Sequence, residues 1–474
     1  MAPRIHFDPV MEPLLTLRDE FELREGRARH GITVFYDTFD GRLHADGVTL
    51  RHADGQLVLI DRETGDELVS ADATGARRLF IADLPEPLRE RLANVIEMRA
   101  LTVIARVRGR RQPVAVLNED AKTVVRLMLE DSRVTTTGVR GYEGELERVR
   151  ELLPASALPF VDEAVLAAGG RPAGTSAKLD LKLDSDEPAT EAAMTVFARL
   201  LEVIAENLPG TLEDIDSEFL HDLRVAVRRT RSLQRQFKAI YSDRLQHFRD
   251  EFKRIQQVTG DLRDLDVYLL DFDDLRASLP EAMQAELDPL RSVLEHRRAK
   301  ALTATRRALK AQRTLDALHE WLEFIQEAPK SEQTVSELAS HRITRVYRKM
   351  VKMGRAIDDD SPAEDLHELR KVGKELRYLL EFFSSLYPPD VVKPFIKTLK
   401  GLQDQLGRFQ DREVQANALR ALAPEVGQPA TVMAMGVLVE RFMKEEIAAR
   451  TEFADRFSAF AGKAQRRTVK DTFG

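Results

Sequence analysis

Two different patterns of hydrophobic and polar positions divide the chain. From about Leu14 to Leu153, short apolar runs with alternating polar residues are separated by turn signals such as ADG and ETG. This alternation is typical of antiparallel strands, and helical spacing near 84–96 and 145–153 predicts two helices that interrupt the sheet. Beyond Thr190 nearly every segment has the spacing of a long amphipathic helix, and breaks such as NLPGT and DDDSPAED separate about eight or more helices.

These patterns predict a multi-domain protein with an α+β N-terminal domain and an all-α C-terminal domain. A length of 474 residues exceeds the usual size of one hydrophobic core, and the Gly, Pro, Ala and Ser content of 169–188 is typical of a linker. We expect an N-terminal domain at 1–155, a linker at 156–188, a helical domain at 189–463 with halves of about 189–328 and 335–463, and a tail at 464–474.

The segment FLHDLRVAVRRTRSLQRQFKAI, Phe219–Ile240, concentrates cations on one face of a predicted helix. At 100° per residue, five basic residues fall within about one third of the circumference: Arg224, Arg228, Arg231, Arg235 and Lys238. Their like-charged neighbours cost about 1–2 kcal/mol in an isolated helix. One interpretation is a solvated face whose long side chains cover apolar surface. The other is the wall of an anion-binding groove.

The same cationic face occurs a second time. The segment DLHELRKVGKELRYLLEFF, Asp365–Phe383, superposes on the first with a shift of 146 residues, which aligns His221 with His367, Arg224 with Arg370, Arg228 with Lys374 and Arg231 with Arg377. Further along, 252–267 aligns with 399–414 at a shift of 147, which pairs Lys253 with Lys400, Gly260 with Gly407 and Asp264 with Asp411. An internal duplication of a multi-helix unit explains both alignments. We expect the two copies to pack together, so that two basic faces line one site.

Composition places these cations in an acidic molecule. The formal net charge is −7, with 32% charged and 43% hydrophobic residues, so a general duplex-DNA binder, which is usually basic throughout, is not favoured. The absence of cysteine excludes disulfides and thiolate metal sites. The sequence begins without the apolar core of a signal peptide, and no window approaches a membrane span. We therefore expect a cytoplasmic protein with no membrane partner, and the oligomeric state stays open.

The pattern His-x-x-Arg-x-x-x-basic-x-x-Arg, present twice and followed each time by Gly-x-x-x-Asp, resembles the conserved histidine α-helical domain, CHAD. The resemblance covers about Ala189–Lys463. It implies two pseudo-symmetric helical bundles around a basic channel that binds inorganic polyphosphate, and it is compatible with a location on polyphosphate granules. The implied ligand residues are His221, Arg224, Arg228, Arg231 and Lys253 in the first half, and His367, Arg370, Lys374, Arg377 and Lys400 in the second, with Arg235, Lys371 and Lys349 as further candidates.

The N-terminal domain resembles the CYTH family of triphosphate-processing tunnel proteins. The matching segments are Tyr36–Arg51 and the strand-like YEGELER at Tyr142–Arg148. The resemblance implies an antiparallel β-tunnel or partial barrel, and in an active member a Glu-x-Glu-x-Lys strand binds metal. Here EFELR ends in Arg24, and Asp61 stands where the family tends to have a lysine, so we expect a degenerate fold without catalysis or cofactor. The alternative is a Mg- or Mn-dependent triphosphatase, with the helical domain as its substrate-binding module, that uses Glu20, Glu22, Glu143 and Glu145.

Two other functions compete with polyphosphate binding. Successive guanidinium groups suit the successive phosphates of a flexible chain, whereas single-stranded nucleic acid also requires exposed aromatic residues, for which Tyr378 is one candidate. His221–Asp222 suggests a His-Asp phosphohydrolase, which needs further ligands that the sequence does not place at an obvious spacing. Asp264 and Asp411 would either hold arginines in place or bind a metal, although acids near a helix N-terminus need no function.

Overall fold

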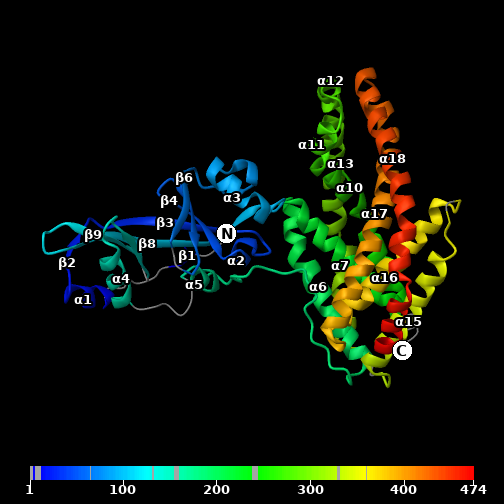
Figure 1. Ribbon diagram of the computed structural model, residues 1–474, viewed down its shortest axis with the longest axis horizontal. Helices are drawn as coiled ribbons and strands as arrows, with labels where there is room; N and C mark the ends of the chain where they lie inside the picture. Colours follow the sequence, from blue (N-terminus) through cyan, green and yellow to red (C-terminus); the bar gives the residue numbers. More distant parts are fainter. Residues whose placement is uncertain are drawn as a thin grey trace. The chain divides into compact units, whose positions relative to one another are not determined.

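The structure, a computed structural model, describes residues 4–5, 12–63, 66–130, 133–153, 160–237, 244–327, 331–358 and 360–474. The chain divides into two compact units, Met1–Ala177 and Lys178–Gly474, which Figure 1 shows as a sheet-containing part and a part made of helices. The predicted antiparallel N-terminal sheet and all-helical C-terminal region are both confirmed. Within the described ranges, every helix is too short or too polar to span a lipid bilayer.

The first unit is built on a ten-stranded sheet whose main path runs β10-β9-β8-β3-β4-β5-β6. The long strand β8 (Leu101–Leu117) also pairs with the short strands β1, β2 and β7. Neighbours along the main path are antiparallel. The other strands are β1 (Arg4–Ile5), β2 (Glu22–Glu25), β3 (Arg29–Asp37), β4 (Val48–Ala53), β5 (Gln56–Asp61), β6 (Glu67–Asp72), β7 (Arg78–Leu79), β9 (Thr123–Glu130) and β10 (Arg133–Gly138).

Helices cover both faces of this sheet. Helix α3 packs on the face that carries Tyr36, whereas α5 packs against Phe35 on the opposite face. Because both faces are covered, consecutive residues of β5, from 57 to 60, are all buried. Helices α1 and α4 share a further core with β9. The helices of this unit are α1 (Glu12–Arg18), α2 (Arg42–Ala45), α3 (Glu86–Ile96), α4 (Glu143–Leu152) and α5 (Phe160–Ala167).

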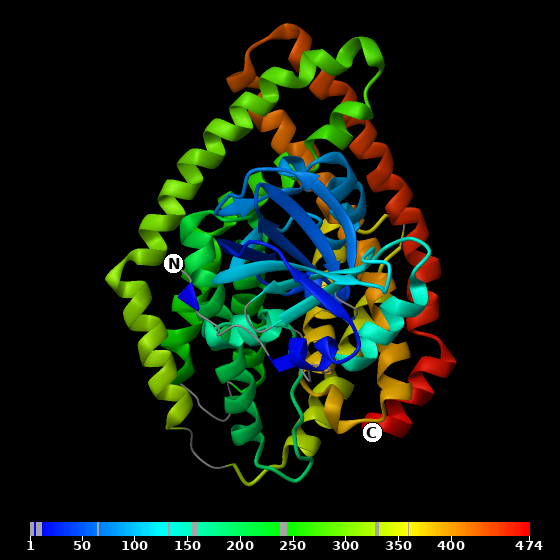
Figure 2. The same ribbon diagram turned by 90° about the vertical axis from the view of Figure 1, so that its left-hand side faces the viewer.

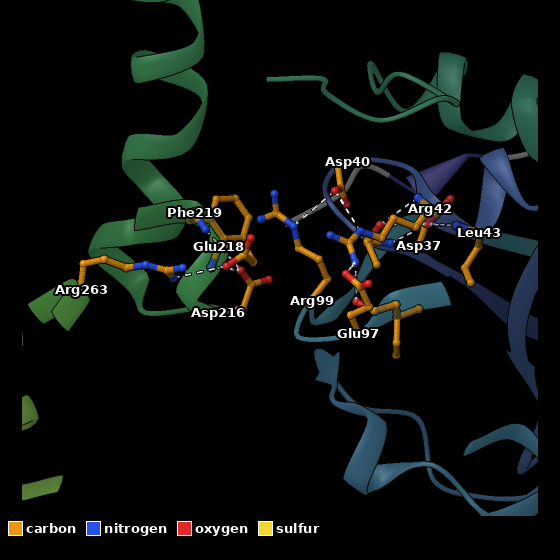
Figure 3. Close-up of polar contacts among 12 residues, drawn as sticks. Asp37, Asp40, Arg42, Leu43, Glu97, Arg99, Asp216, Glu218, Phe219 and Arg263 are labelled. Carbon is orange, nitrogen blue, oxygen red and sulfur yellow. Dashed lines mark hydrogen bonds and ion pairs between the residues drawn. The ribbon is translucent and has the colours of Figure 1, made fainter. Parts of the chain in front are cut away.

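A polar network fixes the turn between β3 and β4 (Figure 3). The buried carboxylate of Asp37 accepts a hydrogen bond from the backbone N–H of Leu43 at 2.9 Å, and burial raises the pKa of Asp37 to about 6. Asp40 forms ion pairs with Arg42 and Arg99, at 3.0 and 3.4 Å. The Asp37 carboxylate also accepts from the backbone N–H groups of Thr38 and His44, so its buried oxygens are hydrogen-bonded.

Part of the segment expected to be a linker is integral to the first unit. Helix α5 lies within it, and the backbone N–H of Thr175 donates to the carbonyl of Phe39 at 2.9 Å. Gly41, with a φ of 70°, lies so close to Ala173 that a Cβ would approach its carbonyl oxygen to 2.2 Å. The compact unit extends to Ala177 because α5 buries apolar side chains on the sheet, a contact that Gly and Pro content does not reveal.

Helix α4 occupies Glu143–Leu152, which confirms the helix predicted near 145–153, and the strand-like interpretation of Tyr142–Arg148 is wrong. Leu146 and Val149 have helical i, i+3 spacing and pack into the same core as β9. Their burial favours a helix over a strand. Glu143 and Glu145 therefore lie on a helix and not on a sheet strand.

The second unit consists of helices. Helices α6 and α7 pack against each other at its start, and α15 and α16 pack against each other in the second half. The helices are α6 (Ala189–Glu213), α7 (Ser217–Gln236), α9 (Arg244–Val258), α10 (Gly260–Leu270), α11 (Phe272–Ala277), α12 (Glu281–Gln284), α13 (Asp288–Lys310), α14 (Gln312–Gln326), α15 (Val335–Gly354), α16 (Ala363–Phe382), α17 (Pro389–Val426), α18 (Pro429–Phe460) and α19 (Lys463–Phe473).

Aromatic clusters form much of the core of the helical unit. Fully buried Trp321 contacts four rings at centroid distances of 4.8 to 5.4 Å, those of Phe197, Phe248, Phe252 and Phe324. In the second half, Tyr347 contacts Phe460 at 5.2 Å.

Helices α11 to α13, together with the adjoining ends of α17 and α18, extend from the rest of this unit as an arm (Figures 1 and 2). The arm has a hydrophobic core of its own around Phe272 and Phe442.

The segment 464–474, expected to be a tail, forms most of helix α19. Val469 and Phe473 are buried, and the Phe473 ring contacts Tyr387 at 4.6 Å. Two apolar residues four positions apart are enough to dock a short amphipathic helix on a preformed core.

Candidate anion-binding site

Helix α7 is held firmly at its N-terminus. The Asp216 side chain accepts hydrogen bonds from the backbone N–H groups of Glu218 and Phe219, at 3.0 and 3.3 Å (Figure 3). Arg263 of α10 pairs with Glu218 at 3.3 Å. Gly210 of α6 lies against the Phe219 ring so closely that a Cβ would meet it at 2.1 Å. The cap and this close approach fix the position of the cationic face.

The two basic helices meet in the structure. Arg228 of α7 lies near enough to Arg370 and Lys374 of α16 to lower the pKa of both, and Arg377 contributes to each shift. We call Arg228, Arg370, Lys374 and Arg377 the central cluster. Its members come from positions up to 149 residues apart in sequence (377 − 228), so folding, and not local sequence, brings these cations together.

Burial and mutual repulsion disfavour the charged forms of the central cluster. Burial is the main cause that lowers the pKa of Lys374 to about 8. The charges of Arg370 and Arg228 lower this pKa further, while Asp411 acts in the opposite direction. Burial likewise lowers the pKa of Arg370. An anion bound beside these cations would offset their mutual repulsion and favour their charged forms, so the central cluster favours anion binding.

Arg224 lies beside the central cluster, and its guanidinium group is hydrogen-bonded to other residues of the protein. Its Nη1 donates to the Gln256 carbonyl and to the Thr259 hydroxyl, both at 2.8 Å. Burial, followed by the charge of Arg228, lowers the pKa of Arg224 to about 10, and Asp264 opposes this shift. Arg224 therefore contributes charge to the site while its side chain anchors α7 to α9.

Carboxylates and amides position the arginines of α16. Arg370 donates to Gln410 at 2.7 Å and pairs with Asp411 at 3.4 Å. Asp411 thus pairs with an arginine of the central cluster, which agrees with one of the two roles expected for it. Asp264 takes the corresponding electrostatic role toward Arg224.

A charged bridge joins α7 to α16. Glu381 accepts a hydrogen bond from Arg229 at 2.7 Å and pairs with Arg377 at 3.4 Å. The ring of Tyr378 lies 6.0 Å from the Arg229 guanidinium and 5.5 Å from that of Arg377. Tyr378 is 5% exposed, so it supports these arginines and does not offer a free stacking surface.

The two histidines of the repeated pattern lie near the start of their helices. The Nε2 atom of His367 is 2.9 Å from a carboxylate oxygen of Glu413, and its ring lies 5.9 Å from that of Phe409. His367 is therefore held against α17. His221 is half-buried on α7.

The remaining lysine candidates are outside the central cluster. Lys371 pairs with Glu368 at 2.6 Å on the surface, and Lys349 of α15 helps to lower the pKa of Glu368. Lys253 and Lys400 are exposed on α9 and α17. Lys238 lies outside the described residues.

Arg231 and Arg235 form a separate group with a residue that the repeat did not indicate. Burial and the charges of Arg235 and Arg249 lower the pKa of Arg231. Arg249 lies on α9, four residues before Lys253, and aligns with Ile396 at the shift of 147. A search for cations at i, i+4 spacing on the predicted helix around Lys253 would have found it.

The four glutamates considered for a metal site have other environments. Glu20 accepts a hydrogen bond from Arg148 Nη2 at 2.6 Å, and Glu143 accepts one from the Gly141 backbone N–H at 3.1 Å. Glu22 lies on β2 and Glu145 on α4. Across the described part of the chain, no group of three or more His, Asp or Glu side chains is arranged to hold a metal ion.

Comparison with known proteins defines the class of the helical unit. Residues 195–420 match the sequence model of the CHAD domain, so the chain contains a CHAD domain, and the predicted family is confirmed for this unit. The match does not extend to the sheet-containing unit. No curated protein matches the chain.

Two solved structures are similar to the chain. The CHAD domain from the plant Ricinus communis is 26% identical, covers 61% of this chain and 94% of that chain, and superposes with a TM-score of 0.47. PptA from Streptomyces chartreusis is 18% identical, covers 57% of this chain and 100% of that chain, and gives a TM-score of 0.46.

Proposed function

We propose that the helical unit binds inorganic polyphosphate. The observation that carries this proposal is the packing of α7 against α16, two copies of one helix pattern. The Arg229–Glu381 and Gln236–Glu375 hydrogen bonds join the two helices, and Arg228 lies near Arg370 and Lys374. The CHAD family to which residues 195–420 belong is associated with polyphosphate binding. Binding of this kind would also place the protein on polyphosphate granules.

The chemistry of the central cluster favours a flexible polyanion. Guanidinium groups form paired, charge-assisted hydrogen bonds with phosphate oxygens, and several in a row engage successive phosphates. Single-stranded nucleic acid is less well matched, because Tyr378 is buried between two arginines and stacking platforms need an exposed ring.

The sheet-containing unit is proposed to be a degenerate CYTH-like domain that does not hydrolyse triphosphate. Its antiparallel sheet is compatible with this fold. The pairing of Glu20 with Arg148 and the placement of Glu143 on α4 do not favour the carboxylate arrangement of an active member. No cofactor is therefore part of the proposed function.

Titration of the full chain with long-chain polyphosphate tests the proposed function. We expect Arg370→Ala to lower the affinity by about 1.5–3 kcal/mol, the typical contribution of a charged hydrogen bond. The affinity of the wild type should fall steeply with salt, because several cations displace counterions from a polyanion. Lys444→Gln on α18 is a matched control, since Lys444 is exposed and pairs only with Glu440 of its own helix among the described residues.

Single-stranded DNA of the same total charge provides the selectivity control. If DNA bound as tightly as polyphosphate, the site would be a general polyanion site. If Arg370→Ala bound long chains as well as the wild type, the central cluster would not be the binding site.

A further inference from the structure

The exposed side of helix α18 carries large apolar side chains. Met433, Val437 and Ile447 are exposed, and Met433 and Ile447 keep 66% and 65% of their surface accessible to solvent. We call Met433, Val437, Glu440, Lys444 and Ile447 the outer stripe. Their spacing of four, three, four and three residues places them within about a quarter of the helix circumference. In the first half of α18 the opposite side packs into the core of the arm, and Figure 2 shows α18 at the outer edge of the helical unit.

The spacing of the outer stripe is typical of a helix that packs against another helix. Single exposed apolar side chains are common on protein surfaces, whereas alternating steps of four and three residues form the seam of a helix pair. Gly436, next to Val437, supports the same interpretation. Apart from its chain neighbours and the local backbone of α18, no atom of the described residues lies within 4 Å of where a Cβ at Gly436 would be. Glycine inside a helix lowers stability relative to alanine, and the close approach of a second helix would give it a role.

The two charged residues of the outer stripe make it complementary to itself. Glu440 and Lys444 form an ion pair at 2.6 Å within α18, and their side chains are 60% and 73% exposed. A second α18 in antiparallel orientation reverses the order of the charges, so Glu440 of each copy faces Lys444 of the other. The same orientation places Val437 of each copy opposite Ile447 of the other. Both pairings are centred on position 442, so one two-fold axis produces all of them, as the interface of a symmetric dimer requires.

We propose that the outer stripe is a homodimer interface, in which the α18 helices of two copies pack antiparallel about a two-fold axis at the level of position 442. The charges fix the register, because a shift by one helical turn would place Glu440 against Glu440 or Lys444 against Lys444. An interface of one helix from each copy is smaller than the standard size of about 1,200–2,000 Å², so we expect a reversible dimer with a dissociation constant on the order of 10 μM. This inference does not rest on polyphosphate binding, because the central cluster lies on other helices.

Sedimentation velocity of the full-length protein, at concentrations below and above this dissociation constant, tests the dimer. We expect Glu440→Lys and Lys444→Glu each to weaken association by about tenfold or more, because each places like charges across the axis. The double variant Glu440→Lys with Lys444→Glu exchanges the charges and should restore association to within about threefold of the wild type. Lys397→Glu makes the same charge change as Lys444→Glu on an exposed residue of α17 outside the outer stripe, and it should leave association unchanged. Polyphosphate titrations at lower protein concentrations keep the chain monomeric, so Lys444→Gln remains a valid control there.

Gly436→Leu separates association from folding. Leucine favours a helix more than glycine does, and the space around Gly436 is open, so the urea midpoint should stay the same or rise. Association should weaken by about tenfold or more, because leucine holds the two helices apart. A wild type that stays monomeric at every concentration would show the inference to be wrong. So would a dimer in which the double charge variant associates as weakly as the single variants, because the contact would then lie elsewhere.

Discussion

Lys374 shows how the fold changes the chemistry of a single side chain. Burial and the charges of Arg370 and Arg228 lower its pKa to about 8 in the free protein. A bound polyanion adds negative charge nearby and raises this pKa again. Binding near or above pH 8 must therefore take up a proton at Lys374, whereas below that range the lysine is already charged.

This linkage predicts a pH-dependent affinity. Long-chain binding should be constant at pH 6 to 7 and fall by about tenfold between pH 7.5 and pH 9.5, because one proton is linked to binding. Lys374→Arg should remove the fall, since arginine stays charged throughout. Lys374→Gln should bind weakly at every pH. Calorimetry in buffers of different ionisation enthalpy measures the proton directly. An unchanged pH profile in Lys374→Arg would contradict the assignment.

Periodicity in the sequence correctly placed several arginines on one helical face but could not divide them by role. Arg224 is tied to Gln256 and Thr259, Arg228 faces α16, and Arg231 belongs with Arg249. These differences arise because different helices pack along the length of α7. Such long-range contacts leave no local signal, so a face can be predicted while the partner of each residue cannot.

At the scale of helices, the two halves align in sequence, but a helix break in one half is absent at the aligned position of the other. Thr259 separates α9 from α10, and its hydroxyl accepts from Arg224 and donates to the Ile255 carbonyl at 2.9 Å. The aligned position in the second half is Leu406, which is buried within the continuous helix α17. A hydroxyl that bonds back to the chain favours a helix break, and a leucine does not. The duplication predicted the helices, and side-chain chemistry decided where one of them ends.

Loss of the Glu381 carboxylate, which bridges α7 and α16, should lower the stability of the protein and raise its affinity for polyphosphate. In Glu381→Gln, Arg229 and Arg377 lose their shared carboxylate, so we expect the free protein to lose about 1–2 kcal/mol of stability. The site gains net positive charge, worth about 1 kcal/mol in affinity for long-chain polyphosphate. Urea unfolding and titration measure the two effects separately. Weaker binding by this variant would mean that Glu381 chiefly orients the arginines.

At the scale of the whole molecule, the sequence identified two regions but misplaced their limits. Residues 160–177 belong to the sheet-containing unit, and α19 belongs to the helical unit. In both cases a short helix docks a few apolar side chains on a distant core. Such a helix is too brief for a strong periodic signal, whereas the long helices around Trp321 and Phe460 were predictable because each has several turns of apolar spacing.

The division into two compact units leads to a prediction about their independence. Each unit has its own hydrophobic clusters, and the central cluster lies wholly within Lys178–Gly474. We expect a fragment of residues 178–474 to bind long-chain polyphosphate within about twofold of the full chain, because no cation of the proposed site is removed.

A triphosphatase that uses its helical domain to deliver substrate would behave differently. The full chain would release phosphate from tripolyphosphate with Mg²⁺ or Mn²⁺, and Glu22→Gln would stop it. Measurement of phosphate release by full chain, fragment and Glu22→Gln therefore separates a polyphosphate-binding protein from an enzyme with a binding module.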